Sequence, residues 1–192
     1  MSLDHMGDLG YNDFPVSLNY ITALPDVSLI PNPDIVVIFK SLSKKDPKTK
    51  EKALQELLGV TDVEDMTIIS WIQMYPKLAL DNSRVVRLLC HQIQERFLSI
   101  VGGKAFSKYL KSSLPIWLMG LYDTDKSVSS TAFKTLSSTF DSEKLEKTWM
   151  IFKEQIINLI TTIINIETEE TLSDKRYTNE SEMTMKYNRA LI

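Results

Sequence analysis

Apolar side chains recur at intervals of three and four residues along most of this chain. No stretch alternates polar and apolar residues for long enough to form a strand. This spacing places the apolar residues on one face of an α-helix. The spacing predicts an all-α fold, with helices over 33–42, 47–58, 63–80, 82–101, 106–121, 126–140 and 142–166 and a short last helix from about 183.

Local signals predict where these helices begin. Asn32-Pro33 and Asp46-Pro47 each combine a side chain that caps a helix with a proline at the first helical position. Proline has no N–H to leave unsatisfied there, and its fixed φ suits the helix. Asp81 and Asp125 are predicted to cap later helices in the same way. Pro76 and Pro115 fall inside helices and predict kinks.

The helices form a repeat. Each unit has a first helix with an aromatic residue and a proline, a turn carrying Asp, and a second helix with Val shortly after that Asp. The turn residues Asp46, Asp81 and Asp125 are 35 and 44 residues apart. These intervals bracket the helix-pair repeats of the HEAT and armadillo class. We therefore expect a HEAT/armadillo-like solenoid of stacked antiparallel helix pairs, with Trp71, Trp117 and Trp149 in the core.

The segments on either side of the repeats lack the repeat pattern. Residues 1–6 resemble an expression-vector remnant, and 7–31 are expected to form an arm anchored by Tyr11, Phe14 and Tyr20. The repeats occupy 32–166. Residues 167–192 are expected to comprise an acidic, solvated linker to about 182 and a short helix. The apolar helix around 149–163 predicts that further repeats follow in the natural protein.

Composition and residue types exclude several function classes. A net charge of −3 does not favour a general nucleic-acid binder, so basic contacts must be local. The single cysteine, Cys90, is expected to be buried in a reducing compartment, and no secretory or membrane-spanning segment is evident. His5 and His91 are the only histidines. We therefore expect no metal, cofactor or catalytic site. The expected compartment is the cytoplasm, and the expected state of the protein is a monomer.

The unusual feature is a run of lysines at one helix start. Residues 40–52 contain six lysines against Asp46 and Glu51, and Lys48 and Lys50 fall in the first helical turn, where the helix dipole disfavours cations. Two interpretations stay open. The run is either a solvated basic face or a docking surface for a phosphate backbone or an acidic protein.

Two stretches resemble the listerin family of ribosome-associated E3 ubiquitin ligases. One is 42–57 (Leu-Ser-Lys-Lys-Asp-Pro-Lys-Thr-Lys-Glu-Lys-Ala-Leu-Gln-Glu-Leu). The other comprises Trp71, Tyr75, Lys77, Leu78, Asp81, Arg84, Val86 and Arg87. A weaker third block comprises Trp117-Leu118-Met119, Asp123-Thr124, Ala132-Phe133 and Phe140.

The resemblance implies the N-terminal domain of a long solenoid whose RING lies elsewhere. It further implies docking on the dissociated large ribosomal subunit, beside the partner that binds the stalled peptidyl-tRNA and its nascent chain. With one cysteine, this chain contains no RING of its own, so its expected role is non-catalytic binding.

The lysine run and the Asp81–Arg87 turn are expected to lie near each other along one ridge, because successive repeats stack in register. The candidate binding residues are Lys44, Lys45, Asp46, Lys48, Thr49, Lys50, Lys52, Tyr75, Lys77, Asp81, Arg84 and Arg87. Their expected partner is ribosomal RNA or an acidic protein face.

A second function class stays open. A HEAT-like adaptor unrelated to ribosomes would bind a peptide or protein in the concave groove formed by the second helices. Gln92, Glu95 and Lys134 are the candidate contacts for that role. The two hypotheses differ in the surface that binds the partner. The listerin-like role uses the turn ridge, and the adaptor role uses the concave groove.

Overall fold

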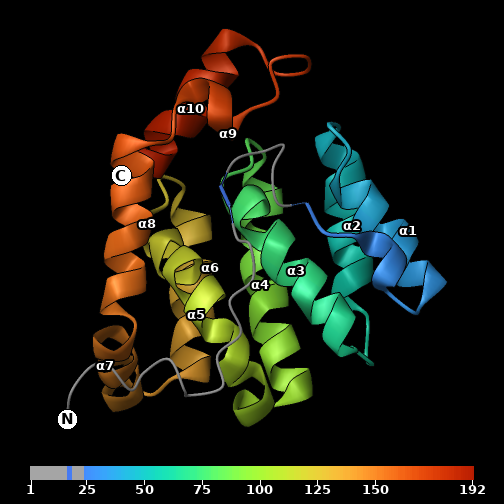
Figure 1. The fold of residues 1–192 in the computed structure, drawn as a ribbon, viewed down its shortest axis with the longest axis vertical. Coiled ribbons are helices and arrows are strands. Elements are labelled where there is room, and N and C mark those ends of the chain that lie inside the picture. Colours follow the sequence, from blue (N-terminus) through green and yellow to red (C-terminus); the bar gives the residue numbers. More distant parts are fainter. Residues whose placement is uncertain (1–16, 19–23) are drawn as a thin grey trace.

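The computed structural model describes residues 17–18 and 24–192. The described residues contain no strand, so the all-α prediction is confirmed (Figure 1). The expectations for Met1–Met6 and for Tyr11, Phe14 and Tyr20 lie outside the described residues. The helices are α1 (Pro33–Leu42), α2 (Pro47–Leu58), α3 (Asp65–Ala79), α4 (Arg84–Val101), α5 (Gly103–Met119), α6 (Lys126–Thr139), α7 (Ser142–Ile151), α8 (Lys153–Asn165), α9 (Glu169–Leu172) and α10 (Glu180–Leu191), with single-turn 3-10 helices η2 (Val27–Leu29) and η3 (Gly120–Tyr122).

The helices pair in sequence order and the pairs stack. α1 packs on α2, α3 on α4, and α5 with η3 on α6. The second helices α2, α4 and α6 lie side by side as one layer, and α3 packs on α5 in the other (Figure 1). α8 packs on α5 and so extends the layer that contains α3 and α5. The arrangement is that of a helical-repeat solenoid, as predicted.

Tryptophans connect the two helices of successive pairs. The indole of Trp71 on α3 donates a hydrogen bond to Gln94 on α4 at 2.8 Å, and Trp117 on α5 donates to Thr135 on α6 at 3.0 Å. Both rings are fully buried. A buried indole needs such a partner for its N–H. The prediction for Trp149 was wrong, because its side chain on α7 is 37% exposed.

The helix starts largely follow the sequence signals. Asn32, Asp46 and Asp125 cap α1, α2 and α6 as predicted. The prediction for Asp81 was wrong: Ser83 caps α4, and its hydroxyl accepts the N–H of Val86. Asp81 instead accepts the backbone N–H of Ser83 at 2.8 Å. Its carboxylate is thereby held two residues before the cap Ser83, where it is available for a distant partner.

The C-terminal part departs from the prediction in two places. The expected single helix over 142–166 is interrupted at Phe152, whose side chain is buried while α7 contributes no buried residue. The expected solvated linker is also wrong for Glu167–Asp174. Glu167, Leu172, Ser173 and Asp174 are buried, α9 lies among them, and α10 crosses back toward the α3–α4 turn (Figure 1).

Candidate functional site

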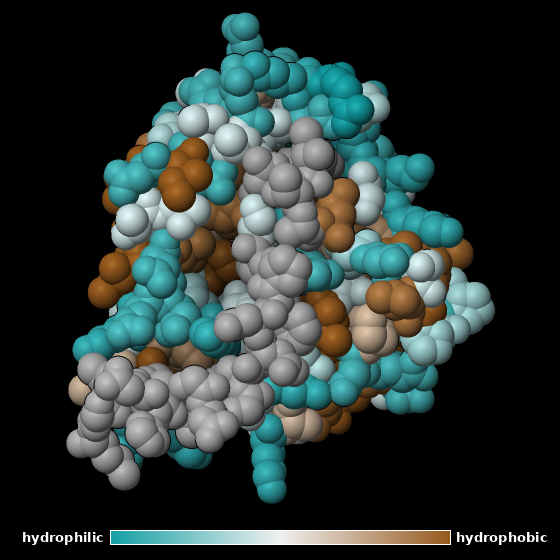
Figure 2. Space-filling view, viewed as in Figure 1, coloured by the Kyte–Doolittle hydropathy of each residue, from teal (hydrophilic) through white to brown (hydrophobic). Residues whose placement is uncertain are grey.

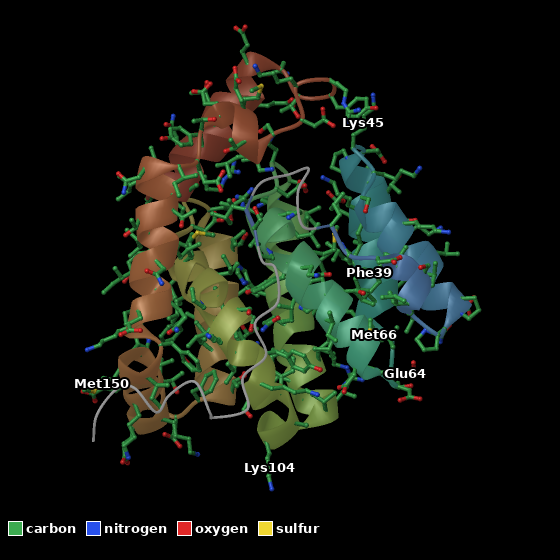
Figure 3. The ribbon with its side chains drawn as sticks, viewed as in Figure 1. Phe39, Lys45, Glu64, Met66, Lys104 and Met150 are labelled. Atoms are coloured by element: carbon green, nitrogen blue, oxygen red, sulfur yellow. The ribbon has the colours of Figure 1, made fainter. Side chains whose placement is uncertain are left out.

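The twelve candidate residues divide into an exposed and a buried group. Lys44, Lys45, Asp46, Lys48, Lys52 and Arg84 are exposed and Thr49 is half-buried. The buried members are Lys50, Tyr75, Lys77, Asp81 and Arg87. The exposed lysines Lys44, Lys45, Lys48 and Lys52, here called the basic turn, lie where α1 leads into α2; Figure 3 labels Lys45 at that end of the molecule.

Asp46 holds the shape of the basic turn. Its carboxylate accepts the backbone N–H of Thr49 at 2.8 Å and the Thr49 hydroxyl at 2.7 Å. These bonds hold the pKa of Asp46 below its ordinary value, so the cap remains charged. Lys48 bonds Glu51 at 3.0 Å and Lys52 lies 3.9 Å from Glu56. Among the described residues, neither Lys44 nor Lys45 forms an ion pair with a carboxylate.

Lys50 does not belong to the exposed basic surface. Its side chain is buried and pairs with Asp81, which joins α2 to the α3–α4 turn. Beside this pair, the hydroxyl of Ser83 donates to Glu51 at 2.9 Å. The expectation that Lys50 and Asp81 face a ribosomal partner was therefore wrong, since both are used inside the domain.

α10 adds two cations to the same turn. Arg189 donates to the backbone carbonyls of Leu80 and Asp81 at 3.1 and 3.2 Å. Lys186 is buried, and burial lowers its pKa to about 8, with the charge of Asp81 opposing the shift. Asp81 thus lies among Lys50, Lys186 and Arg189. This covering of the ridge by α10 was not foreseen.

The other buried candidates have structural partners. Arg87 forms an ion pair with Asp123 at 2.7 Å and donates to the carbonyls of Asp81 and Asn82. Lys77 donates to the carbonyl of Ser17 at 2.7 Å, and burial lowers its pKa to about 8. These side chains fix the turn that carries the exposed residues and are not free to contact a partner. Arg84 is the exposed exception; it lies 4.0 Å from Asp125.

Tyr75 is also structural. Its hydroxyl lies 2.8 Å from Nδ1 of His91, and both side chains are fully buried. Burial lowers the pKa of His91 to about 4, well below the value of about 6.5 for an unfolded histidine. His91 is also in close contact with Gly120, where an added Cβ would lie 2.4 Å from the imidazole Cε1.

The pKa of His91 predicts how stability depends on pH. The unfolded chain binds a proton at His91 near pH 6.5, whereas the folded chain resists it until about pH 4. The free energy of unfolding should therefore fall by about 2 kcal/mol between pH 7 and pH 5 from this group. Urea unfolding at several pH values measures this. In the His91→Gln variant the loss over the same range should be much smaller; an equal loss would assign it to other groups.

A polar cleft of about 590 Å³ separates the start of α2 and the α3–α4 turn from the α9–α10 segment. A smaller hollow of about 390 Å³ lies beside it, between the α1–α2 turn and the α9–α10 loop. Lys45 belongs to both. In the hollow, its ammonium lies 4.9 Å from the centre of the Tyr177 ring, and the guanidinium of Arg176 lies 5.3 Å from the same ring.

Lys175, Arg176 and Tyr177 were missed by the sequence analysis. The acidic composition of 167–182 concealed them, because the loop was expected to be solvated. One signal could have found them: the tripeptide ends two residues before Asn179, which forms a reciprocal capping box with Glu182 at the start of α10. The fold brings this basic-aromatic tripeptide to the basic turn, where the ring of Tyr177 lies near Lys45.

The residues of the adaptor hypothesis lie on α4 and α6. Gln92 and Glu95 of α4 are half-buried, and Glu95 accepts a hydrogen bond from Ser138 of α6. Lys134 of α6 is exposed. Glu95 therefore contributes to packing between the second helices, and no specific contact at these positions favours peptide binding.

An apolar groove of about 340 Å³ lies along α8. Trp149, Ile156, Ile160, Ile163 and Ile164 line it together with Leu118 and the last residues of α10. Ile157, Ile160, Ile164 and Ile166 are exposed, and Figure 2 shows hydrophobic side chains on this side of the molecule. Among residues 17–18 and 24–192, no helix has the length and apolar content needed to cross a membrane.

Comparison with known proteins gives one family. The model for the N-terminal domain of E3 ubiquitin-protein ligase listerin matches residues 30–192. The protein named E3 ubiquitin-protein ligase listerin from Saccharomyces cerevisiae is 36% identical over 95% of this chain and 12% of its own length. Its counterpart from Neurospora crassa is 36% identical over 94% of this chain and 12% of its own length. The counterpart from Gallus gallus is 28% identical over 96% of this chain and 11% of its own length. The chain thus spans about an eighth of the length of these relatives.

Proposed function

Because this chain belongs to the listerin family, in which it is the N-terminal domain, we propose that it docks the ligase on the large ribosomal subunit. The subunit is the dissociated one that carries a stalled nascent chain, and the docked domain sits next to the partner that binds the tRNA and nascent chain. The domain itself acts as a monomeric binding unit in the cytoplasm, where such subunits are found. Ubiquitin transfer is assigned to the remainder of the polypeptide.

The observation that carries this proposal is the basic turn. Lys44 and Lys45 are exposed and outside any described ion pair, and the adjacent α2 is fixed to the α3–α4 turn by the buried Lys50–Asp81 pair. Exposed lysines on a fixed support suit phosphate contacts, which position a protein on RNA without reading its sequence. They also make the affinity depend steeply on salt concentration, because bound counterions are released.

Charge reversal of the basic turn tests the proposal. The variant Lys44→Glu/Lys45→Glu/Lys48→Glu should bind purified large subunits at least about ten-fold more weakly and show a shallower salt dependence in co-sedimentation. Its thermal unfolding should stay within a few degrees of the parent, because exposed ion pairs contribute little to stability. Lys50 is excluded from the variant, since a glutamate there would be buried beside Asp81.

The chain supplies a matched control. Lys104, Lys144 and Lys147 are also exposed, and Figure 3 shows Lys104 at the end of the molecule opposite Lys45. Reversing these three changes the net charge equally and should leave binding close to that of the parent. If both triple variants lose affinity to the same extent, the overall charge and not the basic turn governs binding, and the proposal is wrong.

A further inference from the structure

We propose that the hollow between the α1–α2 turn and the α9–α10 loop holds an unpaired nucleotide of an RNA. The inference rests on the proposed function, in which that RNA belongs to the large ribosomal subunit. The hollow is lined in part by Leu24, Lys44, Lys45, Asp174, Arg176 and Tyr177. Its volume of about 390 Å³ falls in the range of pockets that hold small ligands.

The charge of the hollow suits a phosphate. Lys44, Lys45 and Arg176 face a single acidic residue, Asp174. Asp174 is buried and already bound, because Arg176 donates to its carboxylate from Nε at 2.9 Å and from Nη2 at 2.6 Å. These bonds hold the pKa of Asp174 below its ordinary value, so one cation is neutralised there. Lys44 and Lys45 remain to attract an anion.

The aromatic ring points to a nucleotide over an acidic peptide. Tyr177 is 54% exposed although two cations lie near its ring. Unpaired bases stack on aromatic rings and on the planar guanidinium of arginine, and neighbouring cations then contact the phosphate. An acidic peptide would use the cations alone and would gain nothing specific from the exposed ring. Leu24, also exposed, adds an apolar surface at the same hollow.

The loop that presents Tyr177 is held by its own hydrogen bonds. The carbonyl of Asp174 accepts the N–H groups of Tyr177 and Thr178 at 2.9 and 3.0 Å. The Asp174 carboxylate accepts the N–H of Arg176 at 3.0 Å, and Asn179 caps α10 two residues after Tyr177. The ring is thus placed before any ligand arrives, which lowers the entropy cost of binding.

Binding of a six-residue oligouridylate, followed by fluorescence anisotropy, tests the base contact. Tyr177→Ala should weaken binding about ten-fold, as expected for the loss of one stacked base, while Tyr177→Phe should stay close to the parent. The matched control is Tyr122→Ala, which removes another exposed tyrosine, on η3. An abasic oligomer of the same length should bind the parent as weakly as the uridylate binds Tyr177→Ala. Equal binding of the abasic and normal oligomers would overturn the inference and leave only phosphate contacts.

Ultraviolet cross-linking on purified large subunits separates this inference from the proposed function. Nucleotide-linked peptides should come from the α9–α10 loop and be lost in Tyr177→Ala. If Tyr177→Ala binds and cross-links like the parent while reversal of the basic turn abolishes binding, the nucleotide site is wrong and the docking function stands. If the parent fails to bind subunits but binds the oligomer through Tyr177, the docking function is wrong and the nucleotide site stands.

Discussion

Asp81→Ala is expected to destabilise the domain by about 3–5 kcal/mol, because it leaves buried cations without their counter-charge. Asp81 pairs with Lys50 and accepts the N–H of Ser83, and Lys186 and Arg189 of α10 lie at the same turn. Lys50 and Lys186 are buried and Arg189 is half-buried, so water replaces only part of what the lost carboxylate supplied. Urea unfolding followed by circular dichroism measures the change in the free energy of unfolding.

Two further variants make this result interpretable. Combining Asp81→Ala with Lys50→Met should recover part of the loss, because one uncompensated cation disappears. The exposed pair of Lys48 with Glu51 is the matched control, and Lys48→Ala should cost less than about 1 kcal/mol. A cost of less than 1 kcal/mol for Asp81→Ala would mean that the cations relax into solvent and that Asp81 does not organise the turn.

Gly120→Ala is expected to cost about 3 kcal/mol, at the upper end of overpacking effects. The new Cβ would lie 2.4 and 2.5 Å from the His91 ring and 3.0 Å from the Ala132 side chain. His91 cannot rotate away freely, because it is fully buried and bonded to Tyr75. The melting temperature should therefore fall by roughly 6–12 °C in a domain of this size.

The control lies at the opposite end of α5 from Gly120, and the rescue uses His91. Gly103→Ala adds the same methyl group at the start of α5, where nothing lies within 4 Å, and should be neutral or slightly stabilising. Gly120→Ala combined with His91→Ala should be less destabilised than the sum of the two single variants. Equal melting temperatures for Gly120→Ala and Gly103→Ala would show that α6 and η3 separate without cost.

The sequence predicts those parts of the fold whose cause is local. Asp46 caps α2 because its partner Thr49 is three residues away, and the apolar spacing places Trp71 and Trp117 in the core. Asp81, like Asp46, is a residue that can cap a helix, yet its partner Lys50 is 31 residues away and gives it a different role. The break between α7 and α8 at Phe152 likewise has no proline or glycine to mark it in the sequence. It coincides with the burial of the Phe152 side chain.

The candidate site follows the same division. The exposure of Lys44, Lys45, Lys48 and Lys52 follows from the high local density of lysines, since long charged side chains stay in solvent unless they find a partner. Lys50, Lys77 and Arg87 are buried because they contact Asp81, Ser17 and Asp123, respectively. The spacing of residues in the sequence does not predict these contacts. Tyr177 reaches Lys45 only because α9 and α10 fold back over the ridge, and an acidic, aperiodic stretch gives no sign of that.

The return of α10 to the α3–α4 turn changes how the domain should unfold. A stack of helix pairs in which each contacts only its neighbours can fray from either end, one pair at a time. Here Arg189 bonds the carbonyl of Leu80, 109 residues earlier in the chain, and closes the intervening pairs into one loop of contacts. Detaching α10 then exposes the buried charges at the turn between α3 and α4. Amide hydrogen exchange should accordingly show α10 and α4 opening with one shared free energy, as a single cooperative unit.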